Sequence, residues 1–242
     1  MTGKENEYWI QLKDAAIHAR ECGYGDCLIL LHGNGEDSTY FDAQIRYFSR
    51  THRVIALDTR GHGKSERGTA PFRFEQFAKD LCECMKVLKI RDAHMVGFSD
   101  GGNTAITFAL RYPDRVKSLV LNGANLNPCG MKLFVLIGTF FEYCFCSAKG
   151  LFSKKIRMQK ERLSLMIKQP HIIPSSLKQL HIPTLVIVGS NDMIRQKHSR
   201  LIASSIPDAE FSVIADADHF VAAKKPDQFN HTVENFLNRQ NQ

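Results

Sequence analysis

The chain has 242 residues, of which 43% are hydrophobic and 24% are charged. This composition is that of an ordinary folded protein, and the length suits one α/β domain with a modest insertion, so a disordered chain is excluded. The formal net charge is +7, and most of it lies between Lys149 and Lys168. A nucleic-acid-binding surface is not normally confined to so short a segment, so we expect a small-molecule ligand and no nucleic-acid partner.

Residues 1–8 are polar and charged, and they contain no recognisable secretory signal. The longest apolar stretch, 131–146, is interrupted by Lys132 and Glu142 and falls short of the roughly 20 residues that cross a bilayer. The seven cysteines are odd in number and lack the spacing of a disulfide framework. These observations predict a cytoplasmic protein without a transmembrane segment, and no motif indicates a cofactor or a metal site.

Apolar, β-rich runs alternate along the chain with longer helical patterns, as in a mainly parallel sheet covered by helices. The predicted strands are 8–12, 15–21, 27–31, 53–58, 93–98, 117–122, 184–189 and 210–214. The predicted helices are 38–50, 73–88, 99–111, 195–205 and 226–239. The fold class is therefore α/β, with an eight-stranded, mostly parallel sheet whose first two strands form an antiparallel start.

The alternation breaks once, between residues 126 and 182, where two helical segments at 131–146 and 153–169 replace strands. We interpret 126–182 as a short helical lid inserted into a core made of 1–125 and 183–242. The first lid helix is apolar on most faces, and Phe134, Phe140 and Phe141 are expected to line an acyl pocket, or else only to pack the lid on the core. The basic run 149–168 is interpreted as a solvated lid face, with membrane or nucleic-acid attachment as the alternative.

The candidate nucleophile is Ser99, in Gly97-Phe98-Ser99-Asp100-Gly101-Gly102. This G-x-S-x-G sequence follows a predicted strand and opens a predicted helix, which is the context of a nucleophile elbow. Glycines are needed in this sharp turn because the strand and the helix approach closely. An ordinary helix N-cap serine is the competing interpretation.

An acid and a histidine follow Ser99 in the chain, each directly after a later predicted strand. Asp192 follows strand 184–189 and His219 follows strand 210–214, so both should reach the carboxyl edge of the sheet beside Ser99. His219 would take the proton of Ser99, and Asp192 would orient His219. Asp216 and Asp218 are rival acids, but they lie too near His219 in sequence to reach under its ring easily.

A glycine-containing loop, Leu31-His32-Gly33-Asn34-Gly35, directly follows the strand 27–31. The backbone N–H groups of Asn34 and Asp100 are the candidate oxyanion donors. His32 is interpreted as a structural loop residue. The turn Gly61-His62-Gly63-Lys64-Ser65 ends like a phosphate-binding loop, but the first glycine of that motif is replaced by Asp58, so we interpret it as a structural turn.

With these motifs the sequence resembles the α/β-hydrolase family over almost its whole length. Its further landmarks are Tyr112-Pro113-Asp114-Arg115-Val116 and Pro183-Thr184-Leu185, and the segment from Val96 to Asn125 is most similar to the biphenyl hydrolase-like branch. Dehalogenases and epoxide hydrolases of this family carry aspartate at the elbow, so Ser99 argues against both activities. The resemblance implies acyl transfer to water from esters, thioesters, lactones, amides or activated carbon–carbon bonds.

Ester hydrolysis is the commonest of these reactions and is the predicted activity. Two alternatives stay open: a carbon–carbon bond hydrolase, and a slow-turnover small-ligand sensor that signals through a partner. Asp100 either selects cationic substrates or stabilises the N-terminus of its own helix, and the second reading is favoured. The sequence leaves the oligomeric state open.

Overall fold

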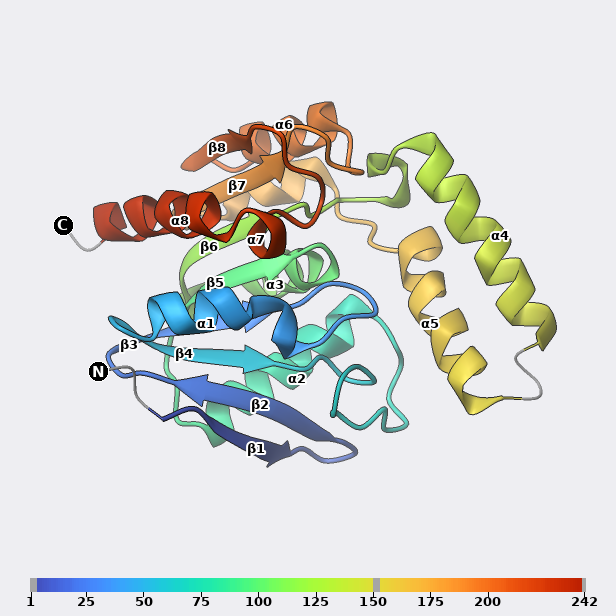
Figure 1. The fold of residues 1–242 in the computed structure, drawn as a ribbon, viewed down its shortest axis with the longest axis horizontal. Helices are drawn as coiled ribbons and strands as arrows, with labels where there is room; N and C mark the ends of the chain where they lie inside the picture. Colours follow the sequence, from blue (N-terminus) through green and yellow to red (C-terminus); the bar gives the residue numbers. More distant parts are fainter. Residues whose placement is uncertain (1–3, 150–152, 241–242) are drawn as a thin grey trace.

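Eight strands form one sheet in the computed structural model, which describes residues 4–149 and 153–240 (Figure 1). The strand order is β1-β2-β4-β3-β5-β6-β7-β8, antiparallel across β1, β2 and β4 and parallel from β4 to β8. The strands are β1 Asn6–Gln11, β2 Ala16–Cys22, β3 Asp26–Leu31, β4 His52–Leu57, β5 Ala93–Phe98, β6 Val116–Asn122, β7 Thr184–Gly189 and β8 Ala209–Ile214. The predicted fold class and the antiparallel start are confirmed.

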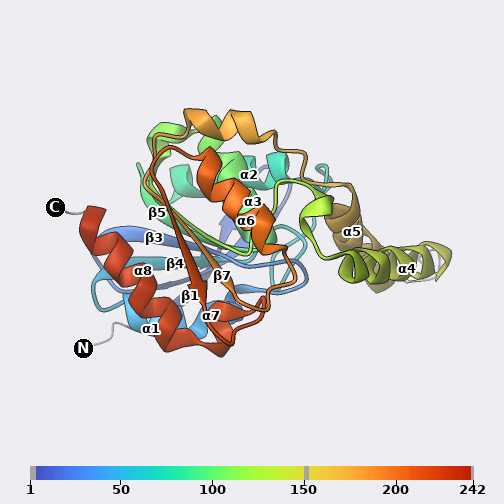
Figure 2. The same ribbon diagram turned by 90° about the horizontal axis from the view of Figure 1, so that it is seen from above.

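Helices cover both faces of the sheet, so its central strands are apolar on both sides. In β3, Leu28 and Leu30 point into one core cluster and Ile29 and Leu31 into the other. Figure 2 shows helices α2, α3 and α6 over one face and α1, α7 and α8 over the other. These helices are α1 Asp42–Phe48, α2 Phe74–Val87, α3 Asp100–Arg111, α6 Gln196–Ser205, α7 Val221–Lys224 and α8 Pro226–Gln240.

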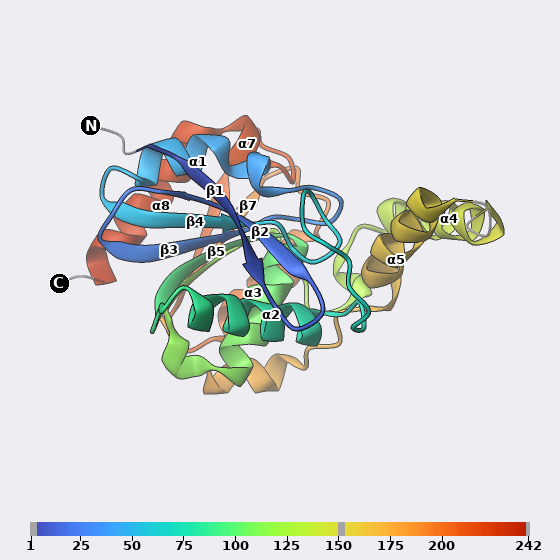
Figure 3. The same ribbon diagram turned by 90° about the horizontal axis from the view of Figure 1, so that it is seen from below.

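Between β6 and β7 the chain leaves the sheet and forms a helical hairpin, α4 Leu133–Lys149 and α5 Lys154–Lys168, which projects from the body of the molecule (Figures 1 and 3). Helix α5 packs against the core through Leu165, which joins Phe74 and Phe77 in a small apolar cluster. Helix α4 packs against α5 on the outer side. None of the helices within the described residues combines the length and apolar character needed to cross a bilayer.

The expected lid boundaries, 126–182, are too wide. Leu126 is fully buried in the main core cluster beneath α2, α3 and α6. The same cluster contains Leu177, within the 3₁₀ helix η4 Pro174–Gln179, and Leu180 just after it. These positions therefore belong to the body of the fold, because they fill the same apolar layer as the sheet and its helices. Within the part of the chain that the structure describes, the segment that projects beyond the core is the α4–α5 hairpin.

A buried arginine fixes the loop between β4 and α2, on which the hairpin rests. The Arg60 guanidinium donates to both carboxylate oxygens of Asp80 at 2.7 and 2.8 Å and to both of Asp14 at 2.9 and 3.0 Å. Removing one partner of such a buried, fully paired charge is strongly destabilising, because it leaves the other charge uncompensated. Arg60 thereby holds the β4–α2 loop in one conformation.

Helix α3 crosses the sheet so closely that its second residue cannot carry a side chain. A Cβ on Gly101 would lie 1.9 Å from the carbonyl oxygen of Leu31 and 2.6 Å from that of His32. We therefore expect Gly101→Ala to lower the free energy of unfolding by roughly 3 kcal/mol or more, because backbone atoms must shift. A Cβ on Gly138, in the exposed helix α4, would meet no atom of another part of the chain within 4 Å. Gly138→Ala is therefore the matched control and should stabilise the protein by up to about 1 kcal/mol. Denaturant unfolding followed by circular dichroism measures both, and a Gly101→Ala protein as stable as the wild type would contradict the close approach.

Candidate active site

Ser99 occupies a tight turn between the end of β5 and the start of α3. Its backbone has φ 51° and ψ −115°, a conformation that non-glycine residues rarely adopt and that costs about 1–3 kcal/mol. A Cβ on Gly97 would lie 2.5 Å from the carbonyl oxygen of Gly101, so the flanking glycines are what allow the turn to close. The strand–turn–helix context predicted for Ser99 is thus present.

His219 and Asp192, from the loops after β8 and β7, meet in a buried hydrogen bond. Nδ1 of His219 lies 2.7 Å from Oδ1 of Asp192, and both side chains are almost fully buried. The same Oδ1 accepts the backbone N–H of Ile194 at 2.8 Å, which fixes the carboxylate. Nε2 of His219 is buried without a hydrogen-bond partner among the described residues, so this ring nitrogen is available to a group in the site.

The rival acids lie elsewhere. The Asp218 carboxylate pairs with the Lys224 ammonium and accepts the backbone N–H of Phe220 at 2.9 Å. Asp216 is exposed and has a positive φ of 51° in the same turn. Of the three candidate acids, the structure brings Asp192 to the histidine.

Two contacts place the His219 ring beside the elbow. Its centroid lies 4.7 Å from that of Phe98, the residue before Ser99. On another side, a Cβ on Gly123 would lie 2.7 Å from the His219 ring and 3.4 Å from Oδ2 of Asp192. The loop after β6 therefore passes directly against the histidine–aspartate pair and requires glycine there.

A small cavity opens beside Ser99 and is lined mainly by uncharged side chains. Its free volume is about 10 Å³, which is close to the space that one water molecule needs. The lining residues are Ser99, Asp100, Asn125, Met131, Met166, Gln169, Met193 and Ile194. Because Met166 and Gln169 belong to or directly follow α5, the hairpin forms part of the wall of this cavity.

Asn34 joins the glycine loop after β3 to both the elbow helix and the hairpin. Its Nδ2 donates to Oδ2 of Asp100 at 2.8 Å and to the carbonyl oxygen of Arg162 at 2.9 Å. The other oxygen of Asp100 accepts from Nδ2 of Asn103 at 3.3 Å, and Asn103 bonds on to Asn125 at 3.0 Å. A chain of amides and one carboxyl therefore runs along the floor of the site.

Burial raises the pKa of Asp100 to about 6, and the hydrogen bonds from Asn34 and Asn103 oppose that rise. Both carboxyl oxygens already accept a side-chain amide, and the group sits in the first turn of α3. This arrangement favours the structural reading of Asp100 over selection of a cationic substrate.

The three phenylalanines expected in the acyl pocket are not there. Phe134, Phe140 and Phe141 are 71%, 53% and 69% exposed on the outer side of α4, and none of them lines the cavity at Ser99. The expectation was wrong because α5, not α4, is the hairpin helix that faces the core. Met131, Met166 and Met193 supply the apolar surface of the cavity instead.

His32 and the turn 61–65, both expected to be structural, make structural contacts. His32 is buried, with Nδ1 2.7 Å from the Gly33 carbonyl oxygen and Nε2 accepting the Thr59 N–H at 2.9 Å. Burial lowers its pKa. In the turn, the Lys64 ammonium pairs with Glu7, so it ties the first strand to the loop after β4.

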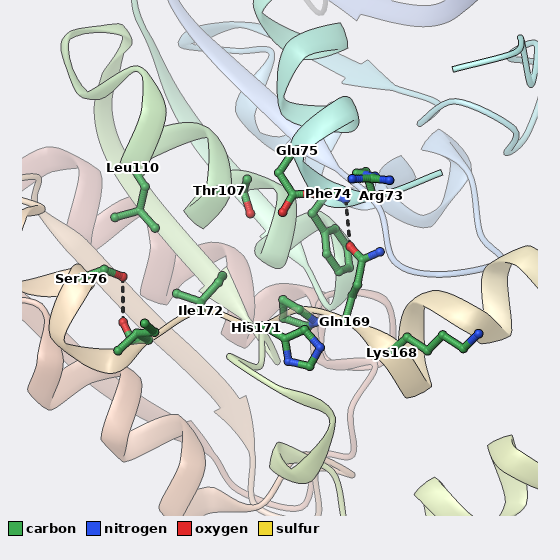
Figure 4. A pocket seen from close by; sticks show the side chains of 12 residues that line it. Arg73, Phe74, Glu75, Thr107, Leu110, Lys168, Gln169, His171, Ile172 and Ser176 are labelled. Atoms are coloured by element: carbon green, nitrogen blue, oxygen red, sulfur yellow. Dashed lines mark hydrogen bonds between the residues drawn. The ribbon is translucent and has the colours of Figure 1, made fainter. Parts of the chain in front are cut away.

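A larger groove of about 610 Å³ lies between α2, α3 and the segment that follows α5 (Figure 4). Its wall includes Arg73, Glu75, Thr107 and His171, and Oε1 of Gln169 accepts the Phe74 N–H there at 3.4 Å. Gln169 is the residue that lines both this groove and the cavity at Ser99. The groove contains none of Ser99, Asp192 and His219, so the smaller cavity is the candidate active site.

Glu36 was missed at the sequence level, although it lies just after the Gly33–Gly35 loop. Its Oε2 is buried without a hydrogen-bond partner among the described residues, 3.2 Å from where a Cβ on Gly33 would lie. Burial raises the pKa of Glu36 to about 7; the Gly33 backbone and the His219 ring lower it, and Asp37 raises it. The sequence signal that could have identified Glu36 is an acidic residue directly after a glycine-containing loop that follows a strand.

A carboxyl whose pKa is higher in the folded than in the unfolded chain keeps its proton up to a higher pH when the chain is folded. The free energy of unfolding therefore falls as the pH rises from the unfolded pKa to the folded pKa. For Glu36 that window runs from its ordinary value of 4.5 to about 7. Glu36→Gln stays neutral, so its free energy of unfolding relative to wild type should rise across this window by about 1–2 kcal/mol, allowing for partial exposure, and level off above it. Urea unfolding from pH 4.5 to 7.5 measures the difference, and a difference independent of pH would contradict the buried carboxyl.

Among residues 4–149 and 153–240, no three His, Cys, Asp or Glu side chains are grouped to hold a metal ion.

Comparison with known proteins connects this site to a family. Residues 26–141 match the family profile of the alpha/beta hydrolase fold. The chain is 27% identical to the 2-hydroxy-6-oxononadienedioate/2-hydroxy-6-oxononatrienedioate hydrolase of Escherichia coli (strain K12), over 94% of this chain and 92% of that protein. It is also 27% identical to a Caulobacter sp. (strain K31) protein named as a carbamate hydrolase, over 91% and 94% of the two chains. The enol-lactonase of Burkholderia xenovorans LB400 has the same fold, with a TM-score of 0.81 at 23% identity over 96% of this chain and all of that one. The expected resemblance to the α/β-hydrolase fold family is confirmed.

Proposed function

We propose that this hydrolase is a serine esterase that cleaves a small carboxylic ester through an acyl-enzyme, with Ser99, His219 and Asp192 as its triad. The observation that supports the proposal most strongly is the position of the His219 ring. Its Nδ1 is held 2.7 Å from Asp192, and its Nε2, beside the elbow that bears Ser99, is buried with no hydrogen-bond partner in the described part of the chain. A neutral imidazole fixed in this way is a general base for a serine hydroxyl.

In the first half-reaction, Nε2 of His219 removes the hydroxyl proton of Ser99 as Oγ attacks the acyl carbon. The N–H groups of Asn34 and Asp100 stabilise the negative oxygen of the tetrahedral intermediate, together with the N-terminal end of α3. His219 then gives the proton to the departing alkoxide, which leaves as the alcohol. Asp192 stabilises the imidazolium between these steps.

In the second half-reaction, water attacks the acyl-enzyme while His219 takes one of its protons. The second tetrahedral intermediate collapses, the carboxylic acid leaves and Ser99 regains its proton from His219. A cavity with room for about one water molecule suits this deacylation step. A cavity of this size must widen before the ester binds, and we expect α5 to move outward because its Met166 forms part of the wall.

The cavity wall supports a neutral, apolar acyl group. Met131, Met166, Met193 and Ile194 line it, and no lysine or arginine appears among its lining residues. Methionine adapts its shape readily, so such a wall accommodates acyl chains of several lengths. Free thiols at Cys84, Cys129 and Cys144 support a reducing, cytoplasmic setting for the activity.

The relatives raise a second candidate, hydrolysis of a carbon–carbon bond or of a carbamate. The Escherichia coli relative is named for a dicarboxylate substrate, and a cation in the site would be expected to bind such a substrate. Because the cavity wall of this chain offers no such cation, the ester remains the favoured substrate. A slow ligand sensor with the same triad would differ by its rate, since an esterase should reach roughly 1–10³ turnovers per second.

A panel of p-nitrophenyl esters of increasing acyl length tests the proposal. The wild-type protein should hydrolyse the best ester at an enzymatic rate, and Ser99→Ala or His219→Ala should each lower turnover by roughly 10⁴- to 10⁶-fold. The double variant should lose little more than either single one, because the two side chains act as one unit. Asp192→Asn should cost less.

Circular dichroism of each variant controls for folding. Single losses that multiply in the double variant would show that the two residues act independently, and the triad would be wrong. A vinylogous 1,5-diketone run beside the esters distinguishes the second candidate: preference for it over every ester would replace ester hydrolysis with carbon–carbon cleavage at the same triad.

A further inference from the structure

The outer face of α4 is apolar and uncovered. Six large apolar side chains along this single helix are between 47% and 71% exposed: Leu133, Phe134, Ile137, Phe140, Phe141 and Phe145. Their spacing of three and four residues puts them on one side of the helix. The opposite side, with Thr139 and Cys146 buried and Tyr143 against Lys160 and Lys168, faces α5.

This patch is large for a protein surface. Six such side chains at these exposures present about 600 Å² of apolar surface, the upper limit of the largest patch on a typical monomer. They also lie on the part of the molecule that projects furthest from the sheet (Figures 1 and 3). A surface in this position is reachable by an extended, flat partner.

Positive charges gather around the patch. Lys149 ends α4, and Lys154, Lys155 and Arg157 begin α5, so the distal end of the hairpin is basic. All four side chains are exposed. The two acids of the hairpin are already engaged: Glu142 accepts from Gln159 at 3.0 Å, and Glu161 forms a bidentate ion pair with Arg67 at 2.8 Å.

Charge complementarity selects the partner. A second copy packed face to face on α4 would cover the apolar side chains but would offer no free acid to the basic end, because Glu142 and Glu161 of its hairpin are already engaged. A nucleic acid would match the lysines and could stack bases on the phenylalanines, but it would leave the aliphatic Leu133 and Ile137 of the same face in water. An anionic lipid surface satisfies both features, with acyl chains for the apolar face and head groups for the lysines.

We propose that the outer face of α4 and the basic distal end of the hairpin dock this protein onto an anionic phospholipid membrane. Helix α4 lies in the plane of the interface, with Phe134, Phe140 and Phe141 below the head groups. Helix α5 remains on the protein side, where it covers the cavity at Ser99. The docking does not depend on hydrolytic activity and is tested without a substrate.

The full-length protein is mixed with vesicles of phosphatidylcholine alone or with 30 mol% phosphatidylglycerol, and bound protein is separated by flotation. The wild type should float with the anionic vesicles and should bind the neutral ones more weakly. Phe134→Ser/Phe141→Ser should lower the partition coefficient by at least about tenfold on both. Tyr24→Ser is the matched control, because Tyr24 is 71% exposed on the body of the fold, and it should leave binding unchanged.

Lys154→Ser/Lys155→Ser separates the electrostatic contribution. It should weaken binding to anionic vesicles by about fivefold per lysine at low salt and leave binding to neutral vesicles unchanged. A polarity-sensitive fluorophore on the exposed Cys144 in a Cys129→Ser background should shift to the blue when anionic vesicles are added. This readout does not require any apolar residue of the face to be changed.

Failure of the wild type to float with either vesicle would overturn the proposal, as would equal flotation of wild type and Phe134→Ser/Phe141→Ser. A wild-type dimer in solution that becomes a monomer in Phe134→Ser/Phe141→Ser would assign the face to a second copy instead. Binding to an RNA oligonucleotide that needs the lysines but not the phenylalanines would assign the basic end to nucleic acid and would also overturn the lipid assignment.

Discussion

The site depends on one constraint: helix α3 approaches strands β3 and β5 more closely than any side chain would permit. Gly97 and Gly101 leave room for this approach, and the turn between strand and helix then forces Ser99 to a φ of 51°. The cost of that conformation, about 1–3 kcal/mol, is small beside the burial of a two-sided sheet, so the fold can hold the serine in place.

The hairpin is linked to this turn through polar contacts, in addition to the small apolar cluster of Leu165, Phe74 and Phe77. Asn34 bonds both to Asp100 in α3 and to the Arg162 carbonyl in α5, and the Arg162 guanidinium donates to the Gly61 carbonyl at 2.6 Å. Burial lowers the pKa of Arg162, and its Nε has no partner among the described residues. These few bonds, together with the Arg67–Glu161 ion pair, keep α5 over a cavity of single-water size. Movement of α5 away from Ser99 requires them to break together.

The architecture was readable from the sequence because each strand is a short apolar run ending at a turn, and the predicted strands agree with the observed ones to within two residues at each end. The approach of Asp192 to His219 followed from the rule that the carboxyl ends of parallel strands share one edge. The hairpin was harder, because α4 is apolar on both sides and its composition does not say which helix faces the core. The methionines around Ser99 were missed for a related reason: Met131, Met166 and Met193 come from three separate segments, and no local pattern joins them.

The central claim is that Ser99 is a nucleophile activated by His219, and covalent labelling tests it without knowledge of the substrate. A fluorophosphonate reacts with an activated serine and leaves a stable phosphonyl ester, whose position tandem mass spectrometry of the digested protein identifies. We expect one adduct per chain, on Ser99, formed far more slowly in His219→Ala. An adduct on a different serine, or labelling of Ser99 at the same rate with and without His219, would contradict it.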